Sequence, residues 1–179
     1  MTLLLELATR RRPARPWWVV IALSLAAVLA ACSHSPDPAE EHPLPTRDPA
    51  DARVAIAALA GELHQQIAPT GKFTKVGVSE IWCEDPQGNA SEEGPYSIRG
   101  VYQVFLPADQ HRSVLTRLGQ EWKAAGWTDV TYSTFGAEGV KANLKGTRPS
   151  DEVTVTLTSG DPPIAFALGI STPCYERPQ

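Results

Sequence analysis

Residues 153–170 read V-T-V-T-L-T-S-G-D-P-P-I-A-F-A-L-G-I, and this stretch decides the fold class. In its first part Val153, Val155 and Leu157 alternate with threonines, which is the pattern of a strand with one buried face. Turn residues follow at 159–163, and the next run, 164–170, is apolar on both faces. No helical segment separates the two strands. We therefore expect an antiparallel sheet in which the second of these strands is central.

Four more strands are predicted N-terminal to this stretch, over about 73–83, 96–106, 130–132 and 140–144. The alternation of apolar residues in the first of them is imperfect, so we expect a β-bulge near Ser79. A long polar loop over residues 85–95 joins the first two strands. Its acidic residues do not have the spacing of an EF-hand, so the loop is interpreted as a solvated hairpin connection.

Two helices complete the predicted domain. Asp48 and Pro49 are suited to begin the first helix, and Pro69 ends it. The second helix begins near Asp109 and ends at a glycine, Gly126. In a glycine-terminated helix the next residue folds back on the helix, so Trp127 is expected to contact Trp122. His111, in the first turn, is expected to face solvent.

The predicted order of elements is α-β-β-α-β-β-β-β, over one domain at residues 48–179. Runs of strands with few helices are typical of an α+β fold. We expect a two-layer sandwich, with a mostly antiparallel sheet of about six strands and two helices on one face.

The charge of this domain excludes one class of partner. The whole chain has 16 Lys and Arg against 20 Asp and Glu. Residues 1–31 contain four arginines and one glutamate, so the remainder has 12 basic and 19 acidic residues, a net charge of −7. Nucleic acids select for basic surfaces. We therefore expect no nucleic-acid partner.

The N-terminal region predicts export. From Trp17 to Ala31 fifteen residues include a single polar one, and an arginine cluster precedes them. A membrane-spanning helix needs about 20 apolar residues, so this run suits the apolar core of a signal peptide over residues 1–31. A buried helix of the fold and an uncleaved signal anchor are the alternatives.

The end of the apolar run resembles the lipobox of bacterial lipoprotein precursors. The matching residues are Leu29-Ala30-Ala31-Cys32: a large apolar residue, two small ones and a cysteine. In that family the thiol receives a diacylglyceryl group and a peptidase cuts before the cysteine. The resemblance implies lipidation at Cys32 and a protein anchored at the extracytoplasmic face of the cell membrane. Residues 32–47, rich in proline, are then the lipidated cysteine and a semi-extended spacer.

The three cysteines agree with this interpretation. If Cys32 carries lipid, Cys83 and Cys174 are left as a pair, and the extracytoplasmic face permits disulfides. Such a bridge is expected to stabilise the fold by roughly 4 kcal/mol. Two unrelated buried thiols are the alternative.

The C-terminal part of the chain resembles small actinobacterial lipoproteins of unknown function. The residues that carry the resemblance are Gly126-Trp127 after the second helix and Ser171-Thr172-Pro173-Cys174 near the end. It covers about the last 60 residues and implies a fold, not an activity.

No motif in the sequence predicts catalysis. A nucleophile elbow, a phosphate loop, a dinucleotide fingerprint and metal-ligand spacing are all missing, so no cofactor or metal is expected. His64 and His111 have no nucleophile near them in sequence. Trp82, beside Cys83, is a candidate for ligand contact, with packing as the alternative.

The sequence therefore favours a non-enzymatic, lipid-anchored binding domain of the cell envelope. Its partner is an envelope protein or a small ligand, and the membrane itself through the diacylglyceryl anchor. The alternative is an envelope hydrolase whose residues assemble only in the fold. A histidine held against a carboxylate in a cleft would favour that alternative.

Overall fold

The computed structural model describes residues 43–179, apart from residues 86, 137–140 and 161–163. The predicted signal peptide, Cys32 and most of the predicted spacer lie outside the described residues. No helix in the described part of the chain has the length and apolar character needed to cross a membrane.

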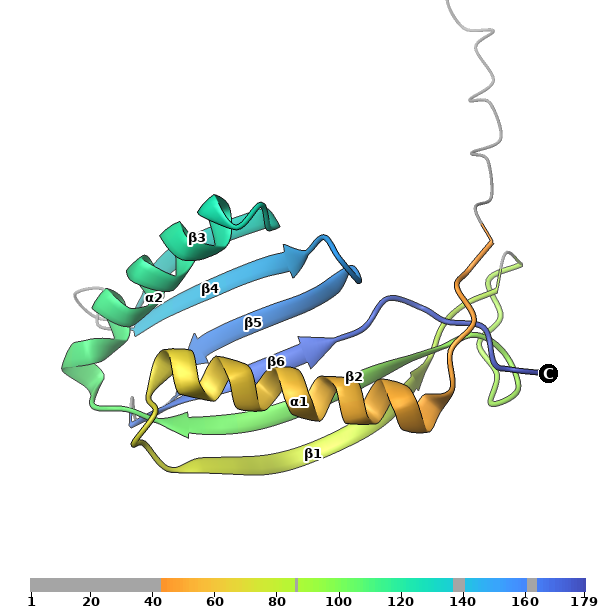
Figure 1. Ribbon diagram of the computed structural model, residues 1–179, viewed down its shortest axis with the longest axis horizontal. Helices are drawn as coiled ribbons and strands as arrows, with labels where there is room; N and C mark the ends of the chain where they lie inside the picture. The colour runs from red at the N-terminus through yellow and green to blue at the C-terminus, as the bar shows by residue number, and fades with distance from the viewer. Residues whose placement is uncertain (1–42, 86, 137–140, 161–163) are drawn as a thin grey trace, which may run out of the picture. The chain divides into compact units, whose positions relative to one another are not determined.

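Two helices and six strands follow one another in the predicted order (Figure 1). They are α1 (Pro49–Ile67), β1 (Phe73–Trp82), β2 (Tyr96–Phe105), α2 (Ala108–Ala124), β3 (Thr128–Phe135), β4 (Lys141–Arg148), β5 (Val153–Ser159) and β6 (Ala165–Ser171).

All six strands form one antiparallel sheet, in the order β1-β2-β6-β5-β4-β3. As predicted, β6 is central, with β2 and β5 on either side. The two halves of this strand order have the same make-up. Each half contains an edge strand with a register shift, its hairpin partner and one central strand, and each half packs against one helix.

Both helices lie on the same face of the sheet, which confirms the two-layer sandwich (Figure 1). The row of paired residues Gly100, Ile170, Val155 and Gly146 runs across four strands. A side chain at Gly100 would meet Ile56 of α1, and one at Gly146 would meet Trp122 of α2. The two helices therefore approach the same side of a single row.

The core lies between these two layers. The side chains that it buries come from alternate positions of the strands and from one stripe of each helix. Phe166, Leu168 and Ile170 of β6 are fully buried. Ala167 and Gly169 point the other way, and no helix of the described residues covers this second face of the strand.

The predicted helix ends are confirmed. The Asp48 carboxylate accepts a hydrogen bond from the backbone N–H of Ala50 at 2.7 Å and caps α1. After α2, Gly126 has a φ of 80°, a conformation that favours glycine. The N–H of Trp127 then bonds the carbonyl of Trp122 at 2.9 Å, and the two indole rings stack with centroids 4.3 Å apart.

The position of the predicted β-bulge was wrong. The register of β1 shifts between Lys75 and Gly77, not near Ser79. Val76, at the shift, is 61% exposed, whereas Val78 packs against the core. Because both valines are apolar, the alternation alone does not say which of them leaves the core face.

Candidate functional site

A disulfide joins Cys83 and Cys174, with an S–S distance of 1.99 Å, as predicted. Cys83 directly follows β1, and Cys174 follows β6. Their strands are separated by β2 in the sheet, and the bridge ties the loop after β1 to the C-terminal segment. We use the name disulfide end for this end of the domain.

The chain enters the domain at the disulfide end, beside its own C-terminal segment (Figure 1). Thr46 and Glu176 form a parallel bridge. The N–H of Arg47 donates to the carbonyl of Glu176 at 3.1 Å, and the N–H of Glu176 donates to the carbonyl of Pro45 at 3.0 Å. The segment that leads into α1 is therefore hydrogen-bonded to the segment that follows Cys174.

Charged and aromatic side chains hold the C-terminal segment against the core. Glu80 of β1 accepts a hydrogen bond from Arg53 of α1 at 2.8 Å and also pairs with Arg177. The Arg177 guanidinium lies 4.9 Å from the ring centroid of Tyr96. The Tyr96 hydroxyl donates to the carbonyl of Arg47 at 2.6 Å, and burial raises the pKa of this tyrosine.

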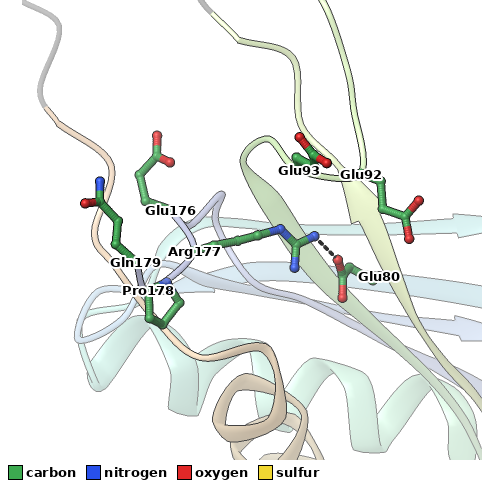
Figure 2. Close-up of a pocket in the computed structure, with 7 residues that line it drawn as sticks. All are labelled: Glu80, Glu92, Glu93, Glu176, Arg177, Pro178 and Gln179. Carbon is green, nitrogen blue, oxygen red and sulfur yellow. Dashed lines mark hydrogen bonds and ion pairs between the residues drawn. The ribbon is translucent and has the colours of Figure 1, made fainter.

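An open cavity of about 650 Å³ lies at the disulfide end (Figure 2). Its walls are mainly acidic, and its lining residues are Glu80, Glu92, Glu93, Glu176, Arg177, Pro178 and Gln179. The one cation in this lining, Arg177, is directed at Glu80, whereas Glu92 and Glu93 extend from the hairpin loop on the other side (Figure 2). Nowhere among the described residues do three or more His, Cys, Asp or Glu side chains form a group that could hold a metal ion.

Trp82, the sequence candidate for ligand contact, is 51% exposed next to the disulfide. It lies two residues from Glu80 and therefore on the same face of β1. It is outside the set of residues that line the acidic cavity. Its role in ligand contact stays a prediction.

The expectation that His111 faces solvent was wrong, because the side chain is completely buried. The Nε2 atom lies 3.0 Å from the carbonyl oxygen of Leu106, and Nδ1 lies 2.9 Å from Oγ of Ser159. Since a carbonyl can only accept, Nε2 carries the proton and Nδ1 accepts from the Ser159 hydroxyl. Ser159 Oγ in turn accepts the N–H of Ala142 at 3.0 Å.

Ser159 and His111 are within hydrogen-bond distance, as nucleophilic catalysis requires, but their surroundings are not those of an active site. A hydrolytic dyad requires a substrate carbonyl to reach the serine oxygen, whereas Ser159 is only 5% exposed and already accepts a backbone N–H. The histidine is oriented by a carbonyl, not by a carboxylate, and packs 4.1 Å from the Phe166 ring centroid. We therefore interpret the pair as a closed structural network that satisfies buried polar groups.

His64 is held in a similar way. Its Nε2 atom lies 2.9 Å from the carbonyl oxygen of Gly71, and its ring stacks on Phe73 with centroids 4.7 Å apart. Neither described histidine of the domain faces a carboxylate in a cleft. The observation that would have favoured an envelope hydrolase is thus missing from the described residues.

Comparison of the chain with protein-family models, with curated proteins and with solved structures found no match.

Proposed function

We propose that the chain is a lipid-anchored extracytoplasmic protein whose α+β domain binds a component of the cell envelope without catalysing a reaction. The disulfide between Cys83 and Cys174 carries this proposal. Stable disulfides are typical of exported proteins and rare in the cytosol. With these two cysteines paired, Cys32 is the remaining cysteine of the chain, and it follows Leu29-Ala30-Ala31 directly.

A short tether follows from this proposal. Pro43, the first described residue of the domain, lies eleven positions after Cys32 in the sequence. A fully extended chain of this length reaches about 40 Å. The prolines of this segment favour an extended conformation. On this proposal Pro43, where the described domain begins, lies within about 40 Å of the lipid anchor.

The absence of catalysis is supported by the chemistry of the described residues. The two histidines bond backbone carbonyls, and the acidic cavity contains one cation that is already paired with Glu80. A domain of this kind presents surfaces rather than an activated nucleophile, which favours binding.

Replacement of Cys32 tests the proposal. In the Cys32→Ser variant the nucleophile that takes the lipid is lost, so we expect the precursor to stay uncleaved or the domain to leave the membrane fraction. Ser33→Ala, at the neighbouring position outside the lipobox, is the matched control and should fractionate as the wild type does. Fractionation followed by detection of the domain measures both. Equal membrane association of wild type and Cys32→Ser, with both chains at the same uncleaved mass, would contradict lipid anchoring and would indicate a signal anchor.

A further inference from the structure

The face of the sheet that carries no helix has a regular arrangement of side chains. Its middle row consists of Lys145, Thr156, Gly169 and Val101, paired in that order across β4, β5, β6 and β2. These positions alternate with the buried row of the core, so they point away from the helices. We call this surface the open sheet face.

A shallow trough of about 190 Å³ runs over the two central strands of the open sheet face. Its lowest points are Gly169 and Ala167, which have little or no side chain. Thr156 and Thr158 of β5 line one side, and Val101 of β2 lies on the other. The trough therefore has space for a ring-sized group that rests directly on the backbone, flanked by hydroxyls.

Polar side chains on both sides of the middle row are fixed by cross-strand bonds. The Asn143 amide donates to the Thr158 hydroxyl at 2.7 Å, and the hydroxyls of Thr147 and Thr154 lie 3.2 Å apart. Each of these hydroxyls and amides retains further capacity to donate or accept. The face is thus a set of hydrogen-bonding groups held in place before any ligand arrives, which lowers the entropic cost of binding.

The charge of the open sheet face is opposite to that of the domain. None of its positions on β2, β6, β5 or β4 is an aspartate or a glutamate, although residues 32–179 have a net charge of −7. Arg99 and Lys145 are exposed on this face, and among the described residues neither side chain has a hydrogen bond or an ion pair. An anionic ligand would complement two cations that nothing in the described domain neutralises.

The spacing of these cations indicates a polymer of low charge density. Lys145 and Arg99 are separated by three strand spacings across the sheet and two residues along it, about 16 Å between their backbones. One strand of a nucleic acid has a charge about every 3.4 Å and would have most of its phosphates unmatched here. A chain with widely spaced acidic groups fits better.

The polar character of the trough indicates a glycan instead of a protein. The centre of a protein–protein interface is enriched in aromatic residues, whereas the trough has none and is lined by threonine, serine, glycine, alanine, one valine and one arginine. An added peptide strand would pair with the edges of the sheet, not with its face. A second copy of the chain, docked face to face, would bring two further cations to a face that has no acidic side chain on β2, β6, β5 or β4 to pair with them.

We propose that the open sheet face binds a linear anionic polysaccharide, with sugar rings over Gly169 and Ala167 and acidic groups at Arg99 and Lys145. This inference rests on the proposed function, because it names the chemistry of the envelope component that the domain binds. The threonine hydroxyls then bond the sugar hydroxyls.

The full chain, purified in non-ionic detergent, tests this inference with hyaluronan as the probe, since its carboxylates alternate with neutral sugars. Isothermal titration at low ionic strength should detect binding that weakens steeply as salt is added. Dextran is the uncharged comparison, and poly-L-glutamate is the acidic polypeptide. We expect neither of these to bind measurably. No binding of hyaluronan, or equal binding of dextran or poly-L-glutamate, would overturn the inference.

Two charge variants and one steric variant locate the site. Arg99→Gln and Lys145→Gln should each weaken hyaluronan binding about fivefold at low ionic strength. Gly169→Leu should fill the trough and abolish binding. A Cβ at Gly169 would meet no atom closer than the Thr156 carbonyl oxygen at 3.8 Å, and chemical denaturation of Gly169→Leu checks that the variant is folded.

Lys123→Gln is the matched control, because it removes the same charge from an exposed position on α2. It should bind hyaluronan as the wild type does. An equal loss of hyaluronan binding in Lys123→Gln would show that the effect comes from net charge alone, and would overturn the proposed site. A dimer in sedimentation that Gly169→Leu dissociates would identify the face as a contact between copies instead. None of these measurements involves Cys32, so the glycan site and the lipid anchor can fail independently.

Discussion

His111 occupies a position in the core that accepts only the neutral imidazole. Both ring nitrogens have fixed partners, Nε2 at the Leu106 carbonyl and Nδ1 at the Ser159 hydroxyl. A second ring proton, on Nδ1, would require the Ser159 hydroxyl hydrogen to turn away and would place a positive charge in the core. Burial accordingly lowers the pKa of His111 from its ordinary value of 6.5.

This lowered pKa predicts that acidification destabilises the domain. Above about pH 6.5 the histidine is neutral in both states, so its full contribution is present; as the pH falls further, the unfolded chain binds a proton that the folded domain does not. The free energy of unfolding should fall by up to about 1.4 kcal/mol per pH unit in this window. Urea denaturation at about pH 7.5 and about pH 5 measures it. His111→Gln should reduce the slope, and an unchanged slope in that variant would contradict the assignment.

Gly146 makes room for the stacked tryptophans. A Cβ at this position would come within 2.9 Å of Trp122 and 3.3 Å of Trp127. We expect Gly146→Ala to destabilise the domain by about 1–3 kcal/mol, because overpacking displaces the rings. Gly77→Ala is the control, since a Cβ at Gly77 meets no atom within 4 Å. Chemical denaturation followed by tryptophan fluorescence compares them, and equal losses would show that packing on the indoles is not the cause.

At the level of elements, the disulfide is the covalent tie between distant segments of the fold. It joins residues 91 positions apart in sequence. Loop-closure entropy predicts a stabilisation of about 4–5 kcal/mol for a loop of this length. The double variant Cys83→Ala, Cys174→Ala, and the wild type in reductant, should therefore unfold at clearly lower urea concentrations than the oxidised wild type. Identical transitions with and without reductant would contradict a structural disulfide.

Local chemistry explains why the elements could be predicted from the sequence. The Asp48 cap, the glycine after α2 and the alternating threonines of β5 each act within a few residues, and each was found in its expected place. His111 was misjudged although the sequence held a signal. It lies four residues before Leu115 and seven before Leu118, on the apolar stripe of α2. Its polarity predicted an exposed side chain. The groups that satisfy its ring nitrogens, Ser159 and the Leu106 carbonyl, lie outside α2, so the pattern of the helix does not reveal them.

At the level of the whole molecule, the strand order and the open sheet face depend on pairings across the sheet. The predicted central position of β6 was confirmed, and the residues of its second face are also apolar. In the structure that face carries Ala167 and Gly169, whose small size forms a trough instead of a second core. The grouping of Arg99 with Lys145 could not be predicted, since their strands are brought together only by the order β2-β6-β5-β4.

The central claim is that Cys32 anchors this domain to a membrane through lipid. Intact-mass and N-terminal peptide mass spectrometry of the membrane-extracted protein tests it most directly. If Cys32 is lipidated, the mature chain begins at Cys32 and carries the added mass of a diacylglyceryl group on its thiol. A chain that begins at Met1, or one with an unmodified Cys32, would contradict it.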